Sequence, residues 1–268
     1  MKKFAAIFLS ALVMAGCTSP APESTPSTAS KPLEGNYTSE MKIPYKTDLS
    51  KEDGADSVER AGDHKGSPYF NQLDFYNMKS TDTLSIIPNF KTYQQTSEWS
   101  CGVCSALMVL DHYDKLGDRT EEDLAKFRSN GLTPEATTLK QMLEIFEGVG
   151  GFTVESTYDY MDDEDALYEA TSLEAIEQHV KNGEPVIVAW NDWGGHWQVI
   201  IGYDNMGTET TQDDVIIMAD SYDTTDHNQD GYGIYPAERF YYNWTMYDFF
   251  EDKGIEERNN LFLVAKPE

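Results

Sequence analysis

The sequence predicts an α+β fold, with helices in the first half of the folded domain and an antiparallel β-sheet in the second half. A run at residues 103–110 is apolar on nearly every side, which is typical of a helix buried between other elements. After residue 184 the pattern changes to short, almost wholly apolar runs, typical of strands covered on both faces. With 268 residues, 40% of them hydrophobic, the chain has enough apolar material for one domain of roughly 200 residues and its appendages.

The N-terminus predicts an export signal. Two lysines precede an apolar segment, residues 4–13, that is too short to span a membrane as a mature helix. The motif Met14-Ala15-Gly16-Cys17 then resembles the lipobox of bacterial lipoproteins, in which the cysteine is acylated and becomes the new N-terminus. We therefore expect a signal peptide of residues 1–16 and a lipid at Cys17 that anchors the protein at the extracytoplasmic face of the cell membrane. An ordinary secretory signal cut nearby is the alternative.

Residues 17–66 predict a disordered tether between the lipid and the domain. The segment Thr18–Pro32 is rich in Ser, Thr, Pro and Ala, and Leu33–Lys65 is polar, charged and nearly free of apolar periodicity. We expect the domain to span residues 67–268, with its first strands in Tyr69–Tyr76 and Leu84–Ile87.

The helices of the domain are marked by their start and stop signals. Ser100 is placed to cap the buried helix, which puts Cys101 in its first turn. Thr120 and Asp123 predict a capping box that opens a helix ending near Ser129. Two more helices are expected at Ala136–Glu147, followed by a glycine-rich stop, and from the Ser172 cap to Asn182.

The strands of the domain follow, apart from one at Phe152–Thr157 that lies between the helices and is followed by an exposed acidic connection, residues 159–165. A proline opens the strand at Glu184–Trp190. The remaining strands are expected at Trp197–Tyr203, Asp214–Ala219 and Leu261–Ala265, with an aromatic-rich loop at Phe240–Phe250 before the last one.

Charge and cysteine usage limit the classes of function. The net charge is -27, from 47 acidic and 20 basic residues, which excludes binding of nucleic acid or anionic lipid headgroups by charge. A solvated acidic surface explains this excess, and basic substrates are the alternative. Only Cys101 and Cys104 accompany Cys17, so the domain has no disulfide framework and depends on its hydrophobic core. The oligomeric state is left open.

Three residues predict a thiol-dependent active site. Free N–H groups and the helix dipole at the start of the buried helix favour a thiolate at Cys101. His196 opens a buried strand after two glycines, where its ring is held in place. If this strand pairs with Asp214–Ala219 about a turn centred near Thr208, Asp220 stands opposite His196 and can accept its ring N–H. Asp223 is the weaker alternative.

A fourth residue, Gln95, is a candidate for stabilising an oxyanion. Its side-chain amide precedes the helix and can reach the same point as the backbone N–H of Cys101.

Taken in order, these motifs resemble the C39-like, papain-fold cysteine peptidases from about Tyr69 to the C-terminus. The resemblance rests on four features: Gln95 six residues before Cys101, the Cys-Gly helix start, a Gly-His-Trp sequence that opens a Val/Ile strand, and Asp220 at the end of the next strand. It implies a papain-like fold with a central N-terminal helix packed on an antiparallel β-sheet, and hydrolysis of peptide bonds in a peptide or protein substrate without a cofactor. Cys101 would be the nucleophile, His196 the general base and acid, Asp220 its orienter and Gln95 the oxyanion donor. Cys104 stands where the family usually has a small residue.

Two other functions remain open. Cys101 and Cys104 form a C-x-x-C pair, as in thioredoxin-like oxidoreductases, although no clear strand precedes the pair. A non-catalytic binding lipoprotein of the cell envelope would keep the fold without a reactive thiol.

A calcium site is a further, weaker possibility. Asp226, Asn228 and Asp230, followed by Gly231, copy the opening of a calcium-binding loop. The twelfth position, however, holds Ala237 instead of the usual glutamate. The alternative is a surface turn in which Gly231 takes a positive φ, and no metal or other cofactor is required.

Overall fold

A computed structural model of the chain describes residues 39–58, 73–225, 228–246, 257 and 259–268. The predicted signal peptide, Cys17 and Asp226 lie outside the described residues, as does the tether up to residue 38. Among the described helices, none is both long enough and apolar enough to cross a membrane.

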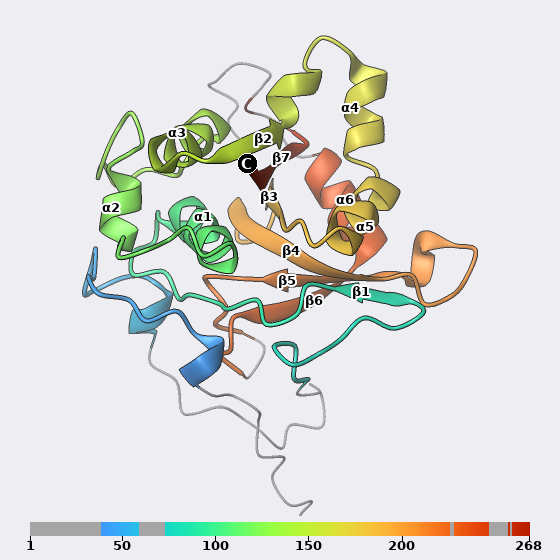
Figure 1. The fold of residues 1–268 in the computed structure, drawn as a ribbon, viewed down its shortest axis with the longest axis horizontal. Helices are drawn as coiled ribbons and strands as arrows, with labels where there is room; N and C mark the ends of the chain where they lie inside the picture. Colours follow the sequence, from blue (N-terminus) through green and yellow to red (C-terminus); the bar gives the residue numbers. More distant parts are fainter. Residues whose placement is uncertain (1–38, 59–72, 226–227, 247–256, 258) are drawn as a thin grey trace, which may run out of the picture. The chain divides into compact units, whose positions relative to one another are not determined.

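The described strands form a single β-sheet with the order β2-β7-β3-β4-β5-β6, and β1 pairs with the C-terminal end of β4 (Figure 1). Every pairing between these strands is antiparallel. The strands are β1 (Leu84–Ile86), β2 (Phe152–Ser156), β3 (Val186–Trp190), β4 (His196–Asp204), β5 (Val215–Ala219), β6 (Tyr232–Pro236) and β7 (Leu261–Pro267).

Six α-helices in the described residues pack around this sheet: α1 (Cys101–His112), α2 (Glu121–Ala125), α3 (Leu139–Val149), α4 (Glu164–Ala170), α5 (Leu173–Lys181) and α6 (Ala237–Thr245). The first ten residues of α1 are all buried, and the helix packs against β4, α2 and α3. The predicted α+β fold, with a central helix on an antiparallel sheet, is therefore confirmed.

Most of the predicted elements are confirmed, with shifted ends. Thr120 and Asp123 form the expected capping box, although α2 ends at Ala125 and does not reach Ser129. The helix expected from Ala136 begins at Leu139, because Thr138 and Gln141 form a second capping box there.

Four elements depart from the sequence prediction. Residues 240–245 of the expected aromatic loop lie in α6, which begins at Ala237, and its Phe240 and Trp244, one turn apart, are both buried; residues 247–250 lie outside the described residues. Tyr232–Pro236 forms β6 against β5, and the last two residues of the acidic connection begin α4. No strand forms in residues 73–76, the described part of the first expected strand.

Part of the expected tether lies against the folded unit. Met41 and Ile43 are buried, and the backbone there exchanges two hydrogen bonds of 2.9 Å with Thr92. Ala55 is also buried. Isolated apolar residues carry no periodicity, so the sequence did not distinguish this covering segment from a linker. The expected boundary at residue 67 thus divides residues that are in contact.

Candidate active site

Cys101 is the first residue of α1, with Ser100 at the N-cap position as expected. The Ser100 hydroxyl does not cap the helix, because it donates to the Ser97 carbonyl and accepts from the Ser97 hydroxyl. The next residue, Gly102, packs so closely that an added Cβ would lie 2.8 Å from Thr137 Cβ and 3.0 Å from Trp197 Cδ1. Glycine here allows the start of α1 to lie directly against β4.

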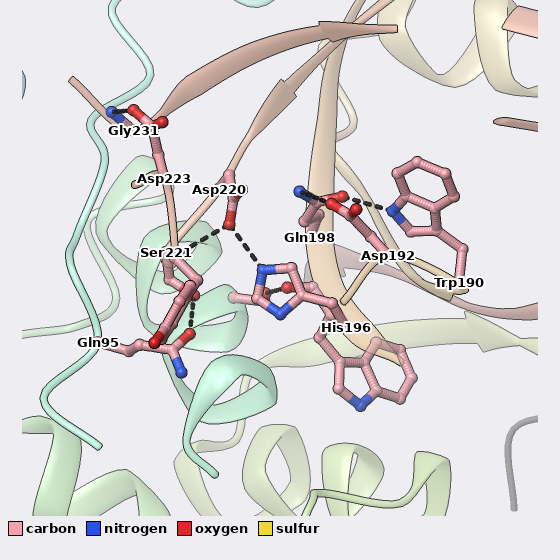
Figure 2. Close-up of polar contacts among 12 residues, drawn as sticks. Gln95, Trp190, Asp192, His196, Gln198, Asp220, Ser221, Asp223 and Gly231 are labelled. Carbon is pink, nitrogen blue, oxygen red and sulfur yellow. Dashed lines mark hydrogen bonds and ion pairs between the residues drawn. The ribbon is translucent and has the colours of Figure 1, made fainter. Parts of the chain in front are cut away.

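His196 and Asp220 form a buried pair beside this helix start. The His196 Nε2 atom lies 2.7 Å from Asp220 Oδ1, and the two side chains are 5% and 7% exposed (Figure 2). Asp220 Oδ1 also accepts a 2.7 Å hydrogen bond from the backbone N–H of Tyr222. Because Asp220 occupies Nε2, the other ring nitrogen, Nδ1, is the one left for Cys101.

The predicted strand register that suggested this pair is wrong. Val199 pairs with Ala219, and a bulge between Ile200 and Gly202 shifts the pairing by one more residue toward the turn. Continued from Val199, this register sets Asp220 opposite residue 198, two positions beyond His196 along the strand. Residues two apart in a strand share one face, so the diagonal neighbours still meet.

The three groups shift one another's pKa values in the direction of an ion pair. Burial raises the pKa of the Cys101 thiol, but the hydrogen bond and positive charge of His196 outweigh it and leave that pKa below its usual value. Burial likewise opposes the charged form of His196, yet the Asp220 carboxylate and the Cys101 thiolate hold the imidazole pKa well above its usual value. Burial opposes charge on Asp220 too, and His196 nevertheless keeps the pKa of Asp220 low.

Gln95 is buried and held at both ends of its amide. Its Oε1 accepts a 2.7 Å hydrogen bond from the Ser221 hydroxyl, and its Nε2 donates at 2.8 Å to the Ser97 carbonyl. Its backbone N–H donates to the Ser221 carbonyl, so the residue after Asp220 fixes Gln95 twice (Figure 2). The orientation of the amide is thereby set, and Nε2 has a second proton beyond the one bound to Ser97.

These side chains surround an open pocket of about 210 Å³. Cys101, His196 and Gln95 line it from α1, β4 and the segment before α1. The rest of its lining consists of Glu98, Trp193, Gly195 and Tyr222. The pocket is therefore the place where a substrate can reach the thiol.

The sequence did not reveal a cluster of polar side chains next to Asp220, centred on Gln198. Gln198 shares a face of β4 with His196, and its Nε2 lies 3.3 Å from both Asp192 Oδ2 and Tyr235 Oη (Figure 2). Trp190 donates its indole N–H to Gln198 Oε1. Burial and the neighbouring Asp220 charge raise the pKa of Asp192, although the His196 charge opposes this. The strand alternation of residues 196 and 198 was the available sequence signal.

Glu121 is the second residue that the sequence did not reveal. This glutamate is 1% exposed and accepts hydrogen bonds from the Thr96 hydroxyl (2.6 Å), the Tyr93 hydroxyl (3.2 Å) and the Cys104 thiol (3.0 Å). It therefore ties the segment that contains Gln95 to α1. Burial and then the Glu121 charge raise the pKa of Cys104 well above its usual value, so Cys104 stays a protonated thiol.

We expect Glu121→Gln to destabilise the fold by about 1–3 kcal/mol, because the amide nitrogen of glutamine faces donors and leaves buried groups unsatisfied. Urea unfolding measures the change. The control is Glu122→Gln on the same helix, which removes only a partly exposed ion pair with Lys126 and should change the unfolding free energy by about 0.5 kcal/mol or less. Equal effects of the two substitutions would contradict the anchoring role of Glu121.

The remaining candidate residues that the structure describes, Asp223, Asn228 and Asp230, do not line the pocket. Asp223 accepts a hydrogen bond from the Gly231 N–H at 2.9 Å, so it orients the following turn. Gly231 has the expected positive φ, and Asn228 donates to Asp230. The described residues contain no group of three or more His, Cys, Asp or Glu side chains able to hold a metal ion.

Three tryptophans that flank the candidate residues in the sequence, Trp99, Trp193 and Trp197, have different positions in the structure. Trp193 is 59% exposed and lines the pocket, whereas Trp197 is fully buried and donates to the Thr137 carbonyl. The Trp99 ring lies 4.4 Å from the Arg128 guanidinium. Of the three, only Trp193 is placed to contact a substrate in the pocket.

Comparisons with known proteins place the chain in a family. No curated protein matches the chain. Among solved structures, the chain is similar to a double glycine motif protease from an AMS/PCAT transporter in complex with the leader peptide, at 16% identity over 70% of this chain and 96% of that chain, with a TM-score of 0.38. A profile of the Peptidase_C39 like family matches residues 87–250, a range that includes all four candidate site residues. Since this match covers more than half of the sequence, the chain belongs to the Peptidase_C39 like family of cysteine peptidases.

Proposed function

We propose that the protein is an exported, lipid-anchored cysteine peptidase that hydrolyses peptide bonds with Cys101, His196, Asp220 and Gln95. The observation that carries this function is the buried His196–Asp220 pair beside Cys101 on the wall of an open pocket. A nucleophilic cysteine needs a base, a group that orients the base, and oxyanion donors. His196 is the proposed base, Asp220 orients it, and Gln95 is the proposed donor beside the backbone N–H of Cys101.

In the proposed mechanism the Cys101 thiolate attacks the carbonyl carbon of the scissile bond. The Gln95 amide and the Cys101 backbone N–H donate to the developing oxyanion. The His196 imidazolium then protonates the leaving amine, and Asp220 keeps the ring oriented and charged until that transfer. His196 next takes a proton from water as the water attacks the thioester; Cys101 leaves as a thiolate, and the thiolate–imidazolium pair is restored.

The proposed location follows from the N-terminal sequence. Residues 1–16 have the pattern of a signal peptide, and Cys17 ends a lipobox-like motif. Two or three acyl chains on Cys17 would hold the domain at the extracytoplasmic surface, where it meets exported peptides and proteins.

The state of Cys104 favours hydrolysis over thiol–disulfide exchange. An exchange reaction needs the second cysteine of the pair as an attacking or leaving thiolate. Cys104 is instead fully buried, its thiol donates to Glu121, and its pKa is well above the usual value. We therefore give it a packing role in the helix.

Alkylation near neutral pH tests the proposed nucleophile. Iodoacetamide or an active-site-directed epoxide should modify Cys101 faster than free cysteine, because the His196 charge favours the thiolate. Peptide mapping should find Cys104 unmodified, and His196→Ala should remove the rate advantage. Modification of Cys101 no faster than free cysteine, or modification of Cys104 first, would contradict the mechanism.

A further inference from the structure

One wall of the pocket is formed by Glu98, Trp193 and Tyr222, none of which takes part in the proposed chemistry. Glu98 is exposed, but its carboxyl group is fixed: Oε1 accepts hydrogen bonds from the Tyr222 hydroxyl at 2.6 Å and from the Gly54 N–H at 3.2 Å. Within the described residues, its Oε2 has neither a hydrogen bond nor an ion pair. The wall thus offers a positioned anionic oxygen at the pocket.

Two aromatic rings stand beside this oxygen. The Trp193 and Tyr222 rings meet edge to face with their centroids 5.7 Å apart, and the Tyr222 ring lies 6.4 Å from the His196 ring. The backbone of Trp193 has a φ of 54°, an uncommon conformation for a residue other than glycine, and its side chain remains 59% exposed. A side chain bound at these rings would therefore lie next to the reacting groups.

The electrostatic environment of this wall is negative. Asp53 accepts from the Glu98 backbone N–H, and burial, Glu98 and Asp53 together raise the pKa of the Tyr222 phenol to about 12. Among the described residues, no lysine or arginine lines the pocket. Arg128, the buried cation whose charge interacts with Cys101, is 2% exposed and donates to backbone carbonyls.

We propose that Glu98, Trp193 and Tyr222 form a subsite for a cationic side chain, lysine or arginine, of the peptide substrate close to the scissile bond. A guanidinium or ammonium group can donate a charge-assisted hydrogen bond to the Glu98 carboxylate and make cation–π contacts with the two rings. An apolar side chain in the same place would displace the water bound to the Glu98 carboxylate and would offer no hydrogen bond in exchange, which is unfavourable. The net charge of -27 adds long-range attraction for such substrates. This subsite rests on the proposed peptidase function.

Small thiol-reactive reagents that share an ethyl spacer and carry opposite charges test the subsite without a known substrate. The thiolate of Cys101 displaces methanesulfinate from aminoethyl or sulfonatoethyl methanethiosulfonate and forms a mixed disulfide. Normalised to the same rates with free cysteine, the cationic reagent should react at least about 10-fold faster than the anionic one. Glu98→Gln, which retains an acceptor for Tyr222, should reduce that ratio about 5-fold. The control is Glu209→Gln, an exposed charge beyond the opposite end of β4, which should leave the ratio unchanged.

Peptide cleavage gives the second measurement, using the full chain and a library of blocked peptides whose cleavage sites are read by mass spectrometry. Lysine and arginine should be enriched beside the cleaved bond, and Glu98→Gln should lower kcat/KM for a lysine peptide about 5- to 10-fold while changing that of its norleucine analogue less than about 2-fold. Cys101-dependent cleavage without this preference overturns the subsite and leaves the peptidase intact. Absence of any Cys101-dependent cleavage overturns the proposed function. The reagent ratio then tests the subsite by itself, and a normalised ratio near one overturns the subsite.

Discussion

Cys101→Ala is expected to lower kcat/KM for peptide hydrolysis by a factor of at least about 10⁴, because it removes the proposed nucleophile and leaves only binding and oxyanion donors. The fold should survive, since the change removes a single sulfur atom at the beginning of α1 and alanine favours a helix. Steady-state hydrolysis of a peptide identified from the library measures the loss, and urea unfolding of the same preparations measures the stability.

The matched control is Cys104→Ala, one turn further along α1. It removes a thiol that donates to Glu121, so we expect a loss of about 1 kcal/mol in stability and hydrolysis within a few-fold of the wild type. A thiol–disulfide oxidoreductase would lose its activity in both variants. Peptide hydrolysis that persists in Cys101→Ala would disprove the assignment of the nucleophile.

The candidate site was predictable because its residues carry strong local signals. Cys101 stands at the start of a fully apolar helix, and His196 opens a strand after two glycines. The choice of Asp220 came from a register that is wrong by two residues, yet the side-chain period of two kept Asp220 on the His196 face. An error of one residue would have turned it to the other face.

The parts that the sequence did not reveal depend on tertiary contacts. Glu121 follows the capping residue Thr120, where an exposed acidic residue is common, and it is buried by tertiary packing of α2 against α1 and against the segment that contains Thr96. Met41 and Ile43 are isolated apolar residues in a polar segment, and their burial against Thr92 has no periodic signature. The bulge in β4 ends at Gly202, and an isolated glycine inside a strand is a signal for a bulge that the predicted register did not take into account.

Asp220→Asn is expected to lower kcat/KM at its pH optimum by about 10²- to 10⁴-fold, since asparagine keeps the shape of the side chain but not the charge that supports the imidazolium. Asp223→Asn is the matched control: it makes the same change three residues away, at a carboxylate that bonds the Gly231 N–H and not His196, and it should retain most of the activity. A larger loss in Asp223→Asn than in Asp220→Asn would reverse the two roles.

The pH profile separates this electrostatic role of Asp220 from a merely structural one. In the wild type, activity should rise with pH as Cys101 ionises below its usual pKa, and fall as His196 loses its proton above its usual pKa. Without the Asp220 charge the pKa of His196 falls, and the weakened imidazolium no longer holds the Cys101 pKa down. The acid limb of kcat/KM should therefore move to higher pH and the alkaline limb to lower pH, so that the profile narrows as its maximum drops. A structural role alone would lower the maximum and leave both limbs in place, because the thiol and the imidazole would still stabilise each other's charged forms.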